Sequence, residues 1–93
     1  MNARELVAWN LRRIRVACHL AQEALAVDAE VDRTYISRLE RNMENPTVAV
    51  LERLAAALNV SIVELFNQPA PGSRRPSPLP SGRKANAKRS RKR

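Results

Sequence analysis

Five polar side chains between positions 33 and 41 could offer hydrogen bonds from one side of a helix. They are Arg33, Thr34, Ser37, Arg38 and Arg41. At about 100° per residue they fall within an arc of about 140°, whereas Ile36 and Leu39 lie outside it. Arginine can donate two hydrogen bonds to guanine O6 and N7, the threonine methyl group can contact thymine, and serine suits several partners. The arc could therefore read base edges, although an ordinary solvated helix face accounts for these residues about equally well.

The preceding residues predict elements that would position this arc. Between Asn2 and Cys18, apolar residues recur every three or four positions, which predicts an amphipathic helix with Cys18 as a small core residue. Several side chains lie largely off that apolar stripe, namely Trp9, Asn10, Arg12, Arg13 and Arg15. Two short helices joined by a turn near residues 29–32 are predicted next, and Asp32 is placed to cap the second of them.

Two more helices are predicted after the arc. Pro46 restricts the residue before it, and Thr47 can cap a helix whose apolar stripe covers residues 50–58. Ser61 and Glu64 have the capping-box spacing that opens a last short helix ending near Phe66. The predicted fold class is therefore all-α, a compact five-helix domain over residues 1–68. Its short second and third helices have the helix-turn-helix arrangement, in which the latter helix enters the major groove of DNA.

The C-terminal residues 69–93 differ in composition from the rest of the chain. They contain five of the six prolines, both glycines, nine of the 17 lysines and arginines, and none of the nine acidic residues. Low hydrophobicity with unopposed charge predicts a disordered basic tail. Residues 1–68 keep eight basic residues against nine acidic ones, so the formal charge of +8 belongs to the tail. The tail could bind phosphates nonspecifically, which we favour, contact an acidic partner, or only keep the protein soluble.

Several classes of function find no support in the residues. Cys18 is the single cysteine and His19 the single histidine, so neither a disulfide framework nor a metal site with three or four side-chain ligands is expected. No nucleophile, phosphate loop or paired-carboxylate arrangement indicates catalysis, and no cofactor is expected. No apolar run approaches the roughly 20 residues of a membrane span, and the N-terminus has no signal-peptide core. We expect an unprocessed cytoplasmic protein that is not an enzyme.

Five segments follow one another in order between about residues 6 and 66. They read LRRIR (11–15), QEALA (22–26), DRTYISRLER (32–41), NPT (45–47) and LERLAAAL (51–58). Together they resemble the XRE-type regulators related to lambda repressor and Cro, and DRTYIS followed by ERN is most similar to the controller proteins of restriction-modification systems. The resemblance implies a lambda-repressor-like domain that binds double-stranded DNA and regulates transcription in a bacterial or phage setting, in association with the nucleoid.

The resemblance also implies roles for individual residues. Positions that face bases or adjacent phosphates are matched by Arg33, Thr34, Ser37 and Arg38. Phosphate-contacting positions are matched by Gln22, Tyr35, Arg41, Asn45 and Thr47. Backbone N–H groups at a helix start also favour a phosphate on electrostatic grounds. Arg15 and Glu40 match a structural ion pair that ties the first helix to the third. A partly buried core position explains Tyr35 almost as well as a DNA contact does.

The expected assembly is a homodimer on a pseudo-palindromic operator, because two half-sites about one helical turn apart raise the specificity of a small motif. Apolar candidates for the dimer interface are Val60, Ile62, Val63, Leu65 and Phe66. Core packing must account for some of them. The competing hypothesis is an antitoxin-type or adaptor protein that mainly binds a protein partner, with operator binding secondary.

Three positions carry other residues where members of this family often have glycine, namely His19, Glu30 and Asn42. Asparagine adopts the left-handed backbone region more readily than most residues, so Asn42 is an acceptable helix end. Asn59 is predicted to end the fourth helix in the same way. Histidine is less suited to this conformation. For Glu30 we expect a cost of about 1 kcal/mol in stability if the turn needs a positive φ.

Overall fold

The computed structural model describes residues 1–70, and the regular elements in that range are all helical. In chain order they are α1 (Ala3–Ala17), α2 (Gln22–Ala29), α3 (Arg33–Glu40), α4 (Val48–Ala57) and the 3-10 helix η1 (Ile62–Phe66). The predicted all-α class is confirmed, although the fifth helix is a 3-10 helix rather than an α-helix. The predicted domain boundary at residue 68 stays a prediction, since nearly all of the proposed tail, residues 71–93, lies outside the described residues.

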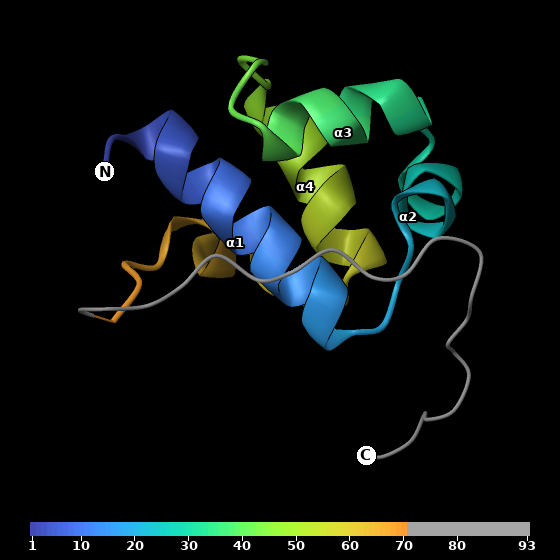
Figure 1. Ribbon diagram of the computed structural model, residues 1–93. Coiled ribbons are helices and arrows are strands. Elements are labelled where there is room, and N and C mark those ends of the chain that lie inside the picture. The colour runs from blue at the N-terminus through green and yellow to red at the C-terminus, as the bar shows by residue number, and fades with distance from the viewer. Residues whose placement is uncertain (71–93) are drawn as a thin grey trace.

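The helices pack so that α3 lies across one side of the molecule. Helix α2 contacts both α3 and α4, α1 contacts α3 and η1, and α4 also contacts η1. Figure 1 shows α2 beside the start of α3, with α1 and α4 passing beneath α3 in that view. The core between these elements consists of aliphatic side chains, and its fully enclosed large members include Leu11, Leu25, Ile36, Leu39, Leu54 and Leu65. Burial of this apolar surface holds α3 against the rest of the domain.

Side-chain caps explain where several of these helices begin. Asn2 and Glu5 form a capping box at the start of α1, in which each backbone N–H donates to the other side chain, at 2.8 and 2.9 Å. The predicted cap at Thr47 is confirmed, because its Oγ1 accepts a hydrogen bond from the Val50 N–H at 3.1 Å. Asp32 occupies the N-cap position of α3, but its side chain accepts no capping hydrogen bond, so that part of the prediction is wrong.

The start of η1 keeps only half of its predicted capping box. The Ser61 Oγ accepts from the Val63 N–H at 3.2 Å, which is the expected cap. The Glu64 carboxylate does not return to the Ser61 backbone; it accepts a hydrogen bond from the Asn67 side-chain amide at 2.9 Å instead. The Glu64 side chain therefore fixes the end of η1 rather than its beginning.

Within residues 1–70, each of the four α-helices is followed by a residue with a positive φ angle. The residues are His19, Glu30, Asn42 and Asn59, with φ between 59° and 61°. The turn between α2 and α3 thus does require a positive φ at Glu30, so the condition for strain at that residue is met. The predicted left-handed conformation of Asn59 is confirmed.

These four ends share the Schellman hydrogen-bond pattern. The residue after the left-handed one donates its N–H to a carbonyl five positions back, as from Val31 to Ala26 and from Val60 to Ala55, both at 3.0 Å. The side chains of Val31 and Val60 also pack against the core. An apolar residue directly after the left-handed residue therefore fixes the direction in which the chain leaves the helix.

Helix α1 differs from the pattern expected from its apolar periodicity. Asn10 and Arg15, expected off the apolar stripe, are buried, because η1 accepts hydrogen bonds from Asn10 and Glu40 of α3 binds Arg15. Conversely, Cys18 is exposed and not part of the core, which corrects the expectation. The reason is that α1 ends at Ala17, so Cys18 follows the last helical residue.

The five apolar residues proposed for a dimer interface divide into two groups. Leu65 has no exposed surface and belongs to the core, so its assignment to an interface is wrong; it points inward from η1 among the aliphatic side chains. Val60 and Ile62 are half-buried against the same core. Val63 and Phe66 remain 63% and 40% exposed. Core packing therefore leaves two of the five, Val63 and Phe66, with exposed apolar surface.

Candidate nucleic-acid interface

Helix α3 and the residue that follows it present the predicted arc on the outer side of the molecule. Arg33, Thr34 and Arg41 are exposed, and Ser37 and Arg38 are half-buried. On the opposite side of the helix, Ile36 and Leu39 are 0% and 1% exposed. The structure therefore brings three guanidinium groups and two hydroxyl groups onto one accessible face, and this face can donate several hydrogen bonds at once.

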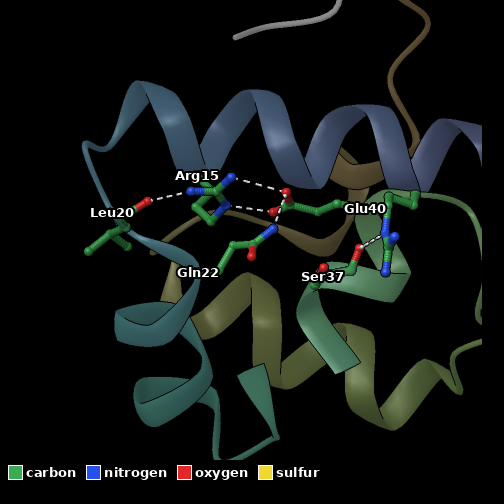
Figure 2. Close-up of polar contacts among 6 residues, drawn as sticks. Arg15, Leu20, Gln22, Ser37 and Glu40 are labelled. Carbon is green, nitrogen blue, oxygen red and sulfur yellow. Dashed lines mark hydrogen bonds and ion pairs between the residues drawn. The ribbon is translucent and has the colours of Figure 1, made fainter. Parts of the chain in front are cut away.

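A buried ion pair attaches α3 to α1. Arg15 donates from Nε to Glu40 Oε2 at 2.6 Å and from Nη2 to Glu40 Oε1 at 3.0 Å, so the contact is bidentate (Figure 2). Its Nη1 donates to the Leu20 carbonyl at 2.6 Å. The two side chains are only 3% and 1% exposed. Because neither charge can be hydrated at this depth, each one needs the other, and α3 is fixed against α1.

Gln22, the first residue of α2, is part of the same network. Its Nε2 donates to Glu40 Oε1 at 3.2 Å, and Figure 2 shows the side chain directed at the carboxylate. The residue is half-buried. Three helices thus meet at one carboxylate, which fixes the relative placement of α1, α2 and α3. An amide nitrogen carries two hydrogens, so the bond to Glu40 leaves Gln22 one donor for an outside partner.

Arg53 of α4 stabilises the turn that precedes α3. Its Nε donates to the Ala29 carbonyl at 3.1 Å and its Nη2 to the Glu30 carbonyl at 3.4 Å. These carbonyls lie at the C-terminal end of α2, where a positive charge interacts favourably with the helix dipole. Sequence reasoning missed this role, because 24 residues separate Arg53 from Ala29 and no local pattern connects them.

A second ion pair lies on the outer face. Arg38 donates from Nε to Glu44 Oε2 at 2.8 Å and from Nη2 to the Met43 carbonyl at 3.2 Å. The side chains of Arg38 and Glu44 are 41% and 28% exposed, so water reaches both. Glu44 was not among the residues predicted for the site. It places an acidic group within the basic arc.

Tyr35 lies at the edge between core and surface. It is half-buried and packs against the aliphatic core. Burial, and next the Glu44 carboxylate, raise the pKa of the Tyr35 phenol, while the positive charge of Arg53 lowers it. The core interpretation therefore fits the ring of Tyr35, and Glu44, whose carboxylate acts on its phenol, also binds Arg38.

The start of α4 adds backbone donors to the site. Asn45 and Thr47 are exposed. Thr47 caps the helix through the Val50 N–H, whereas the N–H groups of Val48 and Ala49 have no partner within the helix because of their position in its first turn. A helix start of this kind carries partial positive charge, which suits a phosphate group.

Asn10 joins α1 to the C-terminal end of the described segment. Its Nδ2 donates to the carbonyls of Leu65 (3.0 Å) and Asn67 (2.8 Å), while its Oδ1 accepts from Arg13 Nε at 3.2 Å. These bonds hold η1 against α1 and so determine where the exposed side chains of η1 lie. Sequence reasoning missed this role, because the bonded residues are more than 50 positions apart.

Comparison with known families agrees with this arrangement. A sequence model described as helix-turn-helix matches residues 11–65, which include both members of the Arg15–Glu40 pair and the whole of α2, α3 and α4. The chain belongs to the helix-turn-helix family. The resemblance to XRE-type regulators and to restriction-modification controller proteins is confirmed. This helix-turn-helix protein is accordingly a DNA-binding transcription regulator and not an enzyme.

Helix-turn-helix relatives cover most of the chain. It is 45% identical over 65 residues to the uncharacterized HTH-type transcriptional regulator y4dJ of Sinorhizobium fredii, covering 70% of this chain and 84% of that protein. It is 40% identical over 68 residues to control protein C.SmaI of Serratia marcescens, covering 73% and 81%. Its structure matches the controller protein C.Esp1396I, solved as a tetramer with its natural 35-base-pair operator, with a TM-score of 0.65, 38% identity and coverage of 71% and 87%.

Neither a metal site nor a membrane-spanning helix has a candidate among residues 1–70 of this helix-turn-helix protein. No group of three or more histidine, cysteine, aspartate or glutamate side chains there is arranged to hold a metal ion. None of the helices in that range is long and apolar enough to cross a membrane.

Proposed function

We propose that this protein recognises a specific double-stranded operator through Arg33, Thr34, Ser37 and Arg38 and regulates transcription from it. The observation that carries the proposal is the orientation of α3. Its outer face has accessible guanidinium and hydroxyl donors, while its inner face is fixed by apolar burial and by the Arg15–Glu40 pair. A helix fixed in this way can present the same donors to each base pair that it meets.

Phosphate contacts would position α3 in the groove. We assign them to Gln22, Tyr35, Arg41, Asn45 and Thr47, which belong to three neighbouring parts of the structure: the α2 start, α3 with its C-terminal cap, and the segment that opens α4. Contacts to the sugar–phosphate backbone carry little sequence information but set the register of the reading helix. The Arg41 guanidinium lies close to α3, since its Nε donates to the Ser37 carbonyl at 3.4 Å.

The operator would be pseudo-palindromic and bound by a homodimer. One α3 reads few base pairs, and two half-sites about one turn of DNA apart give the usual gain in specificity. Val63 and Phe66, exposed on η1, are the apolar side chains that support an interface there, with Val60 and Ile62 beside the core beneath them. The assembly of C.Esp1396I as a tetramer on its operator supports oligomeric binding in this part of the family. Such a regulator would act in the cytoplasm, where bacterial DNA lies.

The basic residues 69–93 would add affinity without sequence preference. Each neutralised phosphate contributes about −0.9 to the slope of log K against log salt concentration, so nine cations can steepen that slope considerably. Deleting residues 71–93 is expected to weaken binding to all duplexes and to flatten the salt dependence, while the ratio between operator and other sequences changes little. An unchanged slope after the deletion would reject this part of the proposal.

The proposal as a whole is tested by selecting duplexes from a random pool. The full chain is expected to enrich one motif with two-fold symmetry, and Arg33→Ala is expected to lose preference at one position in each half-site. Arg4→Ala, which removes an exposed arginine from α1, serves as the matched control and should enrich the parent motif. A parent protein that enriches no motif would reject sequence-specific regulation and favour a protein whose main role is binding a protein partner.

A further inference from the structure

The guanidinium of Arg38 is held along only one of its edges. Its Nε donates to Glu44 Oε2 at 2.8 Å and its Nη2 to the Met43 carbonyl at 3.2 Å, and these are its hydrogen bonds within residues 1–70. The planar group has five N–H donors in a fixed geometry. Glu44 and Met43 occupy the edge formed by Nε and Nη2. Nη1 donates no hydrogen bond within residues 1–70 and Nη2 has a second hydrogen, so the terminal edge of the group keeps two donors for an outside acceptor pair.

The backbone at the end of α3 brings Glu44 to this position. Asn42 adopts φ of 61°, and the Met43 N–H donates to the Arg38 carbonyl at 2.9 Å. This turn directs the chain back along the last turn of α3. Glu44 therefore meets a side chain six residues earlier, and the Met43 carbonyl meets the same guanidinium. The contact follows from local structure and requires no rearrangement of the core.

We propose that Glu44 is a specificity-determining residue that orients Arg38 for a guanine contact. The inference rests on the proposed function, in which Arg38 reads a base edge. A bidentate contact to guanine O6 and N7 needs two parallel donors in one plane. An unrestrained arginine can also turn toward the nearest phosphate, which gives affinity without sequence information. Glu44 fixes the plane of the guanidinium, leaves its terminal edge free, and places a negative charge where a phosphate would otherwise approach.

A simpler role for the same contact makes a different prediction. If Glu44 only neutralises Arg38 until DNA displaces it, removing the carboxylate charge should strengthen binding to every duplex by the same factor. Orientation of Arg38 instead requires that the preference at one base pair changes. Relative affinities among duplexes therefore separate the two roles, whereas a single dissociation constant does not.

The experiment compares the full-length parent with Glu44→Gln on the selected operator and on duplexes substituted at each position. Glutamine keeps the size and an acceptor oxygen but lacks the charge. We expect the preference at the base pair that Arg38→Ala identifies to fall about tenfold, a part of what a whole bidentate contact provides. Affinity for unrelated duplexes is expected to rise. Equal shifts for all duplexes would overturn the proposal while leaving sequence-specific binding in place.

Two further proteins make the result specific to the Arg38–Glu44 pair. Glu52→Gln makes the same charge change at an exposed residue of α4 and should keep the parent preferences. In an Arg38→Ala background, Glu44→Gln should not alter any base preference further, because Glu44 acts through Arg38. A further change in that background would contradict the proposal. If the parent itself selects no motif, the proposed function fails and this inference fails with it.

Discussion

Within the described part of the chain, α3 takes part in two arginine–glutamate ion pairs whose surroundings differ. Arg15 and Glu40 are 3% and 1% exposed, whereas Arg38 and Glu44 are 41% and 28% exposed. A buried charge that loses its partner cannot be hydrated, so the folded state is strongly destabilised. A half-exposed charge can be hydrated instead, so the fold depends little on such a pair. The same two residue types thus stabilise the fold on the inner side of α3, whereas on its outer side they contribute little to folding and stay accessible to DNA.

The largest effect is expected from breaking the buried pair. Glu40→Ala should lower the free energy of unfolding by about 3–5 kcal/mol, because it leaves the Arg15 guanidinium buried without its carboxylate. Gln22 loses a hydrogen bond in the same variant. Urea denaturation followed by circular dichroism measures the change. Glu44→Ala is the matched control and should lower stability by about 1 kcal/mol or less. Equal losses in the two variants would remove the distinction between the pairs.

The next effect concerns the outer pair and should appear in binding rather than in folding. Arg38→Ala should change the free energy of unfolding by about 1 kcal/mol or less. It should also reduce discrimination at one base pair by about 1–3 kcal/mol, the usual value of a bidentate arginine–guanine contact. Competition binding with singly substituted operators measures this. Arg41→Ala should instead weaken all duplexes about equally, since Arg41 is assigned to phosphate. An equal loss of affinity for all duplexes in Arg38→Ala would mean that Arg38, like Arg41, contacts the DNA backbone.

Sequence reasoning was most effective where the physical cause is local. The arc of α3 follows from helical periodicity alone, and the cap at Thr47 follows from one residue type at a helix start. The same periodicity failed for Cys18, because it cannot show that α1 ends one residue earlier. Local rules therefore predicted which face of α3 is exposed and where α4 begins, but they did not give the end of α1.

Contacts between distant residues could not be predicted from local patterns. Periodicity places Arg15 on a polar face, and only the family resemblance suggested Glu40 as its partner. Nothing in the sequence connects Asn10 with the carbonyl of Leu65, or Arg53 with that of Ala29. These polar residues are buried or bound because another element happens to cover them. Their roles depend on packing between distant elements, and local sequence patterns carry no information about such packing.

A smaller effect is expected at the turn that leads into α3. Glu30 has φ of 61°, and its carbonyl accepts from Arg53 Nη2 at 3.4 Å. Glu30→Gly should raise the free energy of unfolding by about 1 kcal/mol, because glycine adopts this conformation without steric cost. Thermal melting measures the gain. Asn42→Gly should gain less, since asparagine tolerates the same region. The prediction is contradicted if Glu30→Gly melts no higher than the parent.

The Glu30→Gly variant also tests whether the turn before α3 affects how α3 is presented to DNA. The hydrogen bond from Arg53 uses the Glu30 backbone and is kept in the glycine variant, so the position of α3 should not change. Base preferences should then match those of the parent even though stability rises. A changed preference would mean that the strained turn, and not only the buried ion pair, determines how α3 is presented.

The smallest effect is a shift in the titration of Tyr35, the only tyrosine. Burial raises the pKa of its phenol above the ordinary value of 10.0, the Glu44 carboxylate raises it further, and Arg53 lowers it. Since the folded-state pKa is the higher one, this contribution to stability is complete below pH 10 and is lost as the pH rises through the folded-state pKa. Phenolate absorbance should therefore appear at lower pH in Glu44→Gln than in the parent.

Arg53→Gln provides the control of opposite sign, because removing its positive charge should move the same transition to higher pH. Shifts in opposite directions would place both charges near the phenol and support an outer face in which Tyr35, Arg38 and Glu44 interact. Identical titrations in the parent and both variants would mean that Glu44 is hydrated away from Tyr35 in solution. Its carboxylate would then be too mobile to orient Arg38. The outer pair would be less ordered than the buried pair as well as more exposed.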